Sequence, residues 1–386
     1  MTVLEVGRLN RRAFPYAAGF RVDLVRDWNQ AASRWTAASR GTGFQHSHWL
    51  NAWYGAFDTV SPLIAIISDA ATGSEVALVP LIRRTQKGIR IVEFADLGLT
   101  DYNAPILGLD APRDVIGVRA LCQALLAALR RLPEGVDLIR MRKMQADVDG
   151  KPNPLASLGR PGSCSLNGNL IVVGDDFEAY RASIKRMQLS RSWRVFSRNP
   201  GAAFRVMANV EEALPLLDTM DAQQQARMHH LGLEFILNDE VRGKFYRDLV
   251  TRGIAEGHVI VSALTCAEEI VATTLGIRQG ANFVFLRISN AGTRWSNCSP
   301  SRLIIERTMA VLHKDGVRQF DLSIGNYAFK RRFGAAPFPL TDASIALSWR
   351  GLPYALRDRA AQQVRRHPWL AERVDRALGK PSREDK

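Results

Sequence analysis

The sequence has few cysteines, and they are scattered. Cys122, Cys164, Cys266 and Cys298 are its four cysteines among 386 residues, and no two form a CxxC pair. This spacing excludes a cysteine-based zinc site and argues against a disulfide framework, and it is typical of reduced thiols in a cytosolic protein. Cys298 lies beside a Ser-Pro turn, but no histidine at a meaningful spacing supports it as a nucleophile.

Long apolar runs are also missing. No run approaches the roughly 20 residues that a helix needs to span a bilayer. Arg11 and Arg12 precede a short apolar segment in the manner of a twin-arginine signal, but Arg21 and Asp23 follow at once. We therefore interpret the N-terminus as part of the mature protein and predict a cytoplasmic location.

Acidic residues are outnumbered by basic ones. The chain has 52 Lys and Arg against 38 Asp and Glu, a formal charge of +14, and 46% apolar residues. The apolar content and the length allow two domains with substantial cores. The charge favours contact with an anion, which includes the phosphates of a coenzyme, RNA, an acidic polysaccharide or an anionic membrane face.

The residue pattern predicts the same order of elements in both halves of the chain. A strand, turn and strand at 75–94, a helix at 114–131 and a strand at 136–142 correspond to strands at 269–288, a helix at 302–314 and a strand at 317–324. This order favours an α/β fold with mixed sheets and an internal duplication. A Pro- and Gly-rich segment, 151–168, has the composition of a linker. We expect an N-terminal domain at 1–160, a C-terminal domain at 161–350 and a basic amphipathic helical tail at 351–386.

The stretch from Asn297 to Gly334 carries the strongest functional signal. Ser299, Pro300 and Ser301 form a turn at the start of the predicted helix 302–314. The first backbone N–H groups of a helix have no partners within it, and the helix dipole adds partial positive charge at the same end. Such a turn can bind phosphate, although an ordinary capped crossover has the same local sequence.

Residue by residue, this stretch resembles the CelD/BcsL acetyltransferases, a branch of the GNAT superfamily related to the FemABX transferases. The residues that match are Ser299, Pro300, Asp321, Gly325, Lys330, Arg331, Arg332, Phe333 and Gly334. Three positions depart from the pattern. Ser301 stands where the family prefers Gly, Leu322 where it prefers Phe, and Phe329 where it prefers Tyr, so a phenol is missing there.

The resemblance implies two tandem GNAT-like units, a FemABX-like architecture, and an N-acyltransferase that uses acetyl-CoA or another acyl-CoA. It implies that the strand at 282–288, with Arg287 and Ile288, presents an open backbone edge to the pantetheine arm. The pyrophosphate would lie near Ser299, Ser301 and Arg302. The resemblance also implies an association with polysaccharide or cell-envelope biosynthesis. It does not imply a metal cofactor.

Acyl transfer to an amine needs a base, and Asp321 is our first candidate. Alternation of Phe320, Leu322 and Ile324 with Asp321 is consistent with a carboxylate that faces a cleft, although a solvent-facing side would look the same. Asp101 is the second candidate. Tyr327 can replace the missing phenol, and Lys330 can neutralise the thiolate or bind phosphate; an ordinary surface lysine is the alternative.

The N-terminal half offers residues for the acceptor. Asp101, Tyr102 and Asn103 follow a strand in a loop dense in hydrogen-bonding groups, as does a family segment that they resemble. A plain Asx-rich turn explains them equally well. His46 lies just before a predicted helix with Trp49 and Trp53 at core positions, and it is a candidate for substrate binding.

A basic run from Arg181 to Arg205 has no acidic residue. Arg191, Arg194 and Arg198 would share one helix face. This run favours a rival function, an aminoacyl transferase that uses charged tRNA, or a non-catalytic binder of an anionic polymer. The basic tail at 351–386 can lie on a membrane surface or cap its domain.

Overall fold

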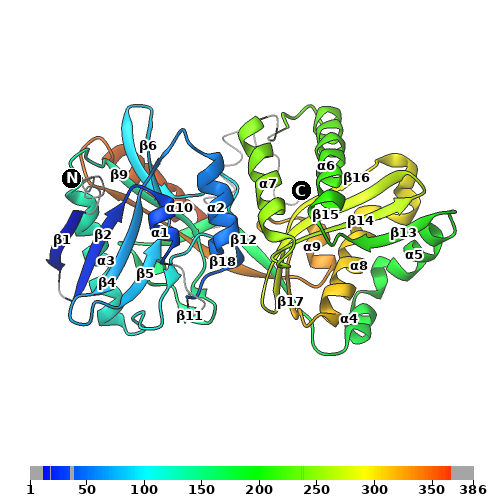
Figure 1. Cartoon of the computed structure of the whole chain (residues 1–386), viewed down its shortest axis with the longest axis horizontal. Helices are drawn as coiled ribbons and strands as arrows, with labels where there is room; N and C mark the ends of the chain where they lie inside the picture. Colours follow the sequence, from blue (N-terminus) through cyan, green and yellow to red (C-terminus); the bar gives the residue numbers. More distant parts are fainter. Residues whose placement is uncertain (1–11, 18, 35–38, 236, 238, 367–386) are drawn as a thin grey trace, which may run out of the picture. The chain divides into compact units, whose positions relative to one another are not determined.

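The chain folds into two compact units. This computed structural model describes residues 12–17, 19–34, 39–235, 237 and 239–366. Unit 1 comprises Met1–Leu166 and Pro339–Lys386, and unit 2 comprises Asn167–Phe338 (Figure 1). Unit 2 is therefore an insertion, in sequence, between two segments that both belong to unit 1.

The strands of unit 1 form sheets, and helices pack against them. Its strands are β1 (Arg12–Ala17), β2 (Phe20–Val25), β3 (Ser61–Pro62), β4 (Ile64–Asp69), β5 (Glu75–Val79), β6 (Leu81–Gln86), β7 (Ile89–Phe94), β8 (Ile106–Leu107), β9 (Leu138–Met144), β10 (Asp147–Val148), β11 (Lys151–Pro152) and the last part of β18 (Ala336–Ala346). Strands β1, β2, β4, β5 and β8 form one sheet in that order. In the other, β9 is antiparallel to β18 and parallel to β7, which pairs with β6.

The helices of unit 1 form where apolar spacing and caps coincide. They are α1 (Trp28–Ala32), α2 (Ser47–Ala56), α3 (Val115–Arg130) and α10 (Leu352–Arg366), with short 3-10 turns at η1 (Gly43–Gln45) and η2 (Pro154–Ser157). Asp114 caps α3 by accepting hydrogen bonds from two backbone N–H groups of its first turn. Trp49 and Trp53 of α2 are fully buried, which confirms the prediction of a core helix with aromatic anchors.

Unit 2 is built on six neighbouring strands. Its strands are β12 (Gly162–Val172), whose first residues belong to unit 1, β13 (Ala202–Val206), β14 (Val259–Cys266), β15 (Glu269–Gln279), β16 (Asn282–Asn290) and β17 (Gln319–Asp321). Their order is β13-β14-β15-β16-β17-β12. Only the pairing of β16 with β17 is parallel among the registers described for unit 2.

Helices cover both faces of this sheet (Figure 1). They are α4 (Phe177–Ser183), α5 (Leu189–Ser197), α6 (Val210–His230), α7 (Glu240–Gly253), α8 (Pro300–Lys314) and α9 (Ala328–Arg332), with 3-10 turns η3 (Lys185–Met187) and η5 (Thr293–Cys298). On one face, Phe283 and Phe285 of β16 pack in the core with Ile305 and Met309 of α8. On the other face, Arg287 of β16 contacts α6 and α7.

The mixed sheets confirm the predicted α/β class, but two local predictions are wrong. The segment 151–168 is not a linker, because Leu155 and Leu158 are buried in the core of unit 1 and β12 begins at Gly162. The strand predicted at 317–324 ends at Asp321, because Ser323 and Gly325 have positive φ angles that turn the chain.

The boundaries of the two units differ from those of the domains that we expect from the sequence, at 1–160, 161–350 and 351–386. The domain division itself remains a prediction. The structure assigns β18 beyond Phe338 and the helix α10 to unit 1. Residues 367–386 of the predicted tail lie outside the described residues.

The β15–β16 hairpin contains a glycine with no room for a side chain. A Cβ at Gly276 would lie 2.5 Å from the carbonyl oxygen of Val284 and 2.2 Å from Cζ of Phe283. We expect Gly276→Ala to lower the free energy of unfolding by about 1–3 kcal/mol, because the overpacked strand must move. Gly174→Ala is the matched control, since its Cβ would meet no atom within 4 Å. Urea denaturation of both variants measures the difference, and equal midpoints would contradict the packing argument.

Candidate functional site

Strands β16 and β17 lie side by side for only part of their length. Their parallel pairing covers Asn282↔Gln319, Phe283↔Phe320 and Val284↔Asp321. Beyond Val284, β16 continues to Asn290, whereas β17 has ended. In the part of the chain that is described, this edge of β16 has no partner strand after Val284. Its backbone groups are therefore placed to pair with an extended ligand.

Side chains hold the end of β17 away from β16. After Asp321, the N–H of Leu322 bonds the carbonyl of Asn169, and the Nδ2 of Asn169 donates to the carbonyls of Ser323 at 2.8 Å and Gly325 at 2.9 Å. Nζ of Lys330 donates to the carbonyls of Ser323 and Ile324 at 3.0 and 2.7 Å. These contacts direct the chain toward β12, so the two strands part.

A β-bulge shapes the unpaired half of β16. Leu275 pairs with Arg287 while Gly276 pairs with Phe285, so Leu286 is an extra residue on β16. A bulge of this kind bends its strand and re-aims the groups beside it. The predicted coenzyme residues Arg287 and Ile288 follow directly.

The start of α8 lies beside the end of this strand. Nδ2 of Asn290 donates to Oγ of Ser301 at 2.7 Å, and Nη2 of Arg302 donates to Oγ of Ser299 at 2.7 Å. Ser299 has a left-handed backbone, and its side chain does not cap the helix. The structure therefore brings the predicted residues Ser299, Ser301 and Arg302 together with the free edge of β16.

The side chain of Arg287 is engaged by two helices of unit 2. It is buried, and its Nη2 lies 2.5 Å from Oδ1 of Asp221, while its guanidinium stacks over Tyr246 at 4.8 Å. It also donates to Oε1 of Gln224. The guanidinium is thus engaged by α6 and α7, which leaves the backbone of β16 as the part of this segment available to a ligand.

Gln224 is a residue that sequence reasoning missed. Its Nε2 donates to the carbonyl of Ile288 at 3.0 Å, and its Oε1 accepts from Arg287. It therefore fixes the unpaired part of β16 from α6. The signal available in the sequence was the run of three glutamines, Gln223 to Gln225, inside an amphipathic helix.

Asp321 is buried at the point where the strands part. Phe320 and Leu322 belong to the core beneath α8, so Asp321 between them points to the face that carries α6 and α7. Its Oδ1 accepts a hydrogen bond from the N–H of Ser323 at 2.6 Å. Because the strand ends at Asp321, the predicted alternation does not extend to Ile324, and the role of Asp321 as a base remains a prediction.

Tyr327 and Lys330 lie next to each other at the start of α9. Tyr327 is 62% exposed, and Nζ of Lys330 lies 5.3 Å from the centre of its ring. Lys330 itself is only 3% exposed. It is therefore not the surface lysine of the alternative interpretation, and its bonds to two carbonyls favour a positioning role.

Cys298, at the end of η5, is fully buried, and its thiol donates to the carbonyl of Trp295 at 3.1 Å. Burial raises the pKa of this thiol above its ordinary value. The group therefore stays protonated near neutral pH, which agrees with the weak case for a nucleophile.

The predicted acceptor residues Asp101, Tyr102, Asn103 and His46 all lie in unit 1. Tyr102 is buried, and its carbonyl accepts a hydrogen bond from Nε2 of Gln45 at 3.0 Å. His46 precedes α2, and its Nδ1 accepts from the N–H of His48 at 3.3 Å. Their roles toward a substrate stay predictions.

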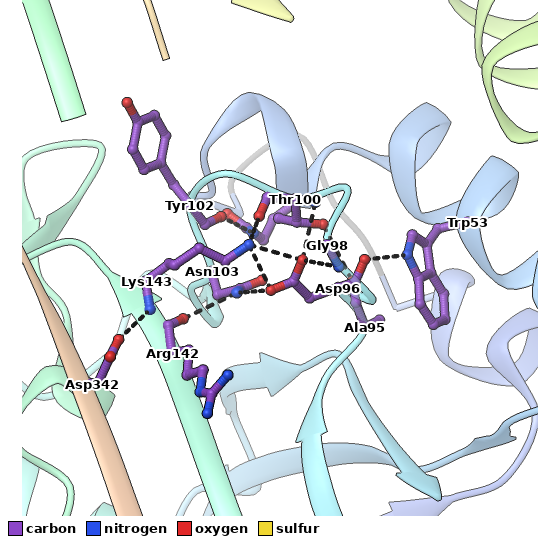
Figure 2. Close-up of polar contacts among 11 residues, drawn as sticks. Trp53, Ala95, Asp96, Gly98, Thr100, Tyr102, Asn103, Arg142, Lys143 and Asp342 are labelled. Carbon is purple, nitrogen blue, oxygen red and sulfur yellow. Dashed lines mark hydrogen bonds and ion pairs between the residues drawn. The ribbon is translucent and has the colours of Figure 1, made fainter. Parts of the chain in front are cut away.

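Figure 2 shows that Asn103 belongs to a polar cluster around Asp96. The carboxylate of Asp96 accepts from Nδ2 of Asn103 at 2.9 Å, from the N–H groups of Gly98 and Thr100, and from Nζ of Lys143 at 2.8 Å. Lys143 also donates to the carbonyl of Thr100. The loop at 96–103 is therefore ordered by an internal ion pair, which supports the turn interpretation of Asn103.

The basic run 181–205 is only partly neutralised. Arg181 is paired with Glu178 and Glu306, and Arg205 with Glu212. Arg191 and Arg194 of α5 are exposed, and so is Arg198, the residue that follows the helix. This exposure is expected if the three residues share one outward helix face. Phe196 is buried and Trp193 partly so, with Arg307 stacked over the latter. An anionic partner for this run is a proposal.

The described residues contain no cluster of three His, Cys, Asp or Glu side chains arranged to bind a metal ion. Nor do they contain a helix whose length and apolar character would let it cross a membrane.

Part of the chain resembles a known protein family. Residues 183–331 match the family model for the acetyltransferase (GNAT) domain. The match includes β16, α8, β17 and most of α9. None of the curated proteins matches the chain.

Solved structures resemble the whole fold. The structure of FemX aligns with a TM-score of 0.54 at 10% identity, over 78% of this chain and 92% of that one. A conserved protein of unknown function from Bacteroides thetaiotaomicron gives 0.50 at 14% identity, over 83% and 96%. A tandem GNAT protein of the clavulanic acid pathway gives 0.47 at 10%, over 85% and 99%. At these identities the likeness concerns the fold, and two GNAT-like units with a FemABX-like architecture are confirmed.

The ion pair in Figure 2 predicts a stability effect. We expect Lys143→Met to lower the free energy of unfolding by about 3 kcal/mol, because the Asp96 carboxylate, whose side chain is only 15% exposed, would be left without its cation. Arg40→Met removes one partner of the exposed pair with Asp149 and should cost less than about 1 kcal/mol. Chemical denaturation of both variants tests this, and equal losses would show that Asp96 does not need Lys143.

Proposed function

We propose that the chain is an N-acyltransferase that moves an acyl group from an acyl-CoA to an amine acceptor through unit 2. The observation that carries the proposal is the parting of β16 and β17 directly beside the start of α8. The GNAT domain match at 183–331 supports it. Acetyl-CoA is the first donor to test, and cytoplasm, where acyl-CoA is made, is the proposed location.

The residues present fit an acyl-CoA. Beyond Val284, the edge of β16 that lacks a partner strand offers backbone groups to the amides of a pantetheine arm, except the carbonyl of Ile288, which already accepts from Gln224. The start of α8, where Ser299 leaves the helix uncapped by a side chain, offers partial positive charge to phosphates. The thioester supplies the activated acyl group when bound.

Asp321 is the proposed general base. Its carboxylate lies at the junction of the two strands and would take a proton from the attacking amine nitrogen. The backbone at the bulge near Leu286 would orient the acyl carbonyl. The hydroxyl of Tyr327, on an exposed side chain, would give a proton to the departing sulfur. Lys330 would act as a positioning residue that keeps the strands apart.

The acceptor is proposed from the resemblance to CelD/BcsL enzymes. It would be an amino sugar or another amine of polysaccharide or cell-envelope biosynthesis. The tRNA-dependent transferase remains the second candidate, because Lys185, Arg186, Arg191, Arg194 and Arg198 are exposed on unit 2. tRNA binding with a steep salt dependence, without CoA binding, would select that candidate.

Asp321→Asn tests the base. We expect acyl transfer to fall by about 10²–10⁴, while acyl-CoA still raises the melting temperature because the carboxylate is not part of the donor site. The control is Asp315→Asn, an exposed residue at the end of α8. Turnover is measured as thiol release over a panel of amines. Full turnover in Asp321→Asn would remove this residue from the role.

Ser301→Asp tests the donor site. A carboxylate at the start of α8 repels phosphates, so we expect CoA affinity to fall at least about tenfold. The same charge favours the helix dipole, so the melting temperature of the free protein should not fall. Ser301→Asn is the neutral control. Calorimetric titration with CoA gives the affinities, and unchanged binding in Ser301→Asp would place the phosphates elsewhere.

A further inference from the structure

Helix α10 is held to unit 1 by polar contacts along one face. Asp358 accepts hydrogen bonds from Nε of Arg140 at 3.1 Å and Oγ of Ser344 at 2.7 Å. One turn later, Nε2 of Gln362 donates to the carbonyl of Asp342 at 3.3 Å. Ala355 is buried on the same side in a small apolar core. The inward face of the helix is therefore fixed.

The turn that enters α10 is fixed as well. The N–H of Leu347 and Oγ of Ser348 donate to Asp137, at 2.9 and 2.6 Å. Gly351 lies so close to the same residue that a Cβ there would be 1.9 Å from its carbonyl oxygen. Hydrogen bonds from Arg90 and Ser348 hold the pKa of Asp137 well below its usual range. The backbone at Trp349, between these anchors, is therefore held in place.

Large apolar side chains are exposed at the start of α10 and in the turn before it. Trp349 is 79% exposed, Leu352 47% and Leu356 52%. Leu352 and Leu356, at i and i+4, share one side of α10, and Trp349 precedes them in the turn that enters the helix. We name these three residues the Trp349 stripe. Because an exposed group of this kind forgoes hydrophobic burial, it marks a contact surface.

The charge around the stripe is positive. Arg350 and Arg357 are exposed beside it, with their guanidinium groups 5.6 and 5.8 Å from the ring centres of Trp349 and Tyr354. Asp358 is the single acidic residue between Trp349 and Arg366. Its Oδ2 lies 3.1 Å from Nε of Arg140, and its Oδ1 lies 3.0 Å from Nη2 of Arg357. Because Arg140 and Arg357 share this one carboxylate and Arg350 adds a further charge, the apolar groups are accompanied by a net positive charge.

Exposed apolar residues with arginines beside them favour an anionic lipid surface as the binding partner of the Trp349 stripe. Tryptophan prefers the boundary between acyl chains and headgroups, leucines enter the acyl region, and arginines pair with anionic headgroups. We propose that the Trp349 stripe, with Arg350 and Arg357, docks unit 1 on the surface of an anionic membrane. The proposal is independent of the acyl transfer reaction, because no residue of the candidate site belongs to it.

Vesicle binding by the full chain tests the proposal. The probes are vesicles of phosphatidylcholine alone and of phosphatidylcholine mixed with phosphatidylglycerol, at low and high salt. We expect binding to the anionic vesicles, weakened by salt. The variant Trp349→Ser/Leu352→Ser/Leu356→Ser should bind them at least about tenfold less. Arg350→Gln/Arg357→Gln should reduce binding to the anionic vesicles and remove its salt dependence.

A matched control uses the exposed apolar residues of a different surface. Leu109, Val115 and Ile116, near the start of α3, are 64%, 73% and 82% exposed. Their replacement by serine should leave vesicle binding unchanged. Equal losses in both triple variants, or no vesicle binding by the wild type, would overturn the proposal. So would a dimer that the stripe variant dissociates without any change in vesicle binding, because a second copy would then be the occupant.

Discussion

The candidate site depends on two parallel strands, β16 and β17, that are kept from pairing beyond Val284 and Asp321. Unpaired backbone groups beside a neighbouring strand are normally satisfied by extending the ladder, since each unsatisfied group has a free-energy cost. Here the chain after Asp321 has other partners, because the amide of Asn169 and the ammonium of Lys330 bond its carbonyls. Both side chains thus stabilise a short β17, and the edge of β16 stays open as a result.

The two faces of the unit 2 sheet have different chemistry. Beneath α8 the strands present an apolar core that includes Phe283 and Phe320. Beneath α6 and α7 they present Arg287, which bonds Asp221 and Gln224. The apolar face fixes the strand positions. The polar face, to which Asp321 also points, is where proton transfer to or from a ligand is physically reasonable.

Unit 1 uses its buried charges for structure. Asp96 and Lys143 satisfy each other and the surrounding loop, and Asp137 and Asp358 fasten the approach to α10 and the helix itself. In unit 1 these charged side chains stabilise the fold, whereas in unit 2 Asp321 lies at the candidate site. This contrast agrees with a protein in which only one GNAT-like unit carries the candidate site. In our proposals, the other unit presents a surface to a membrane.

The sequence by itself determined the α/β class, the repeated order of elements, most helix and strand positions, and the turn at Ser299 to Ser301. These follow from short-range periodicity and backbone preferences, which any window of the chain contains. It also marked Asp321 and Lys330 as residues to examine. The tertiary structure decided the length of β17, the burial of Leu155 in a segment with the composition of a linker, and the commitment of Arg287 to α6 and α7. Each of these depends on partners distant in sequence, such as Asn169 for β17 and Asp221 for Arg287. Local pattern could not reveal them, because it does not record which distant groups meet.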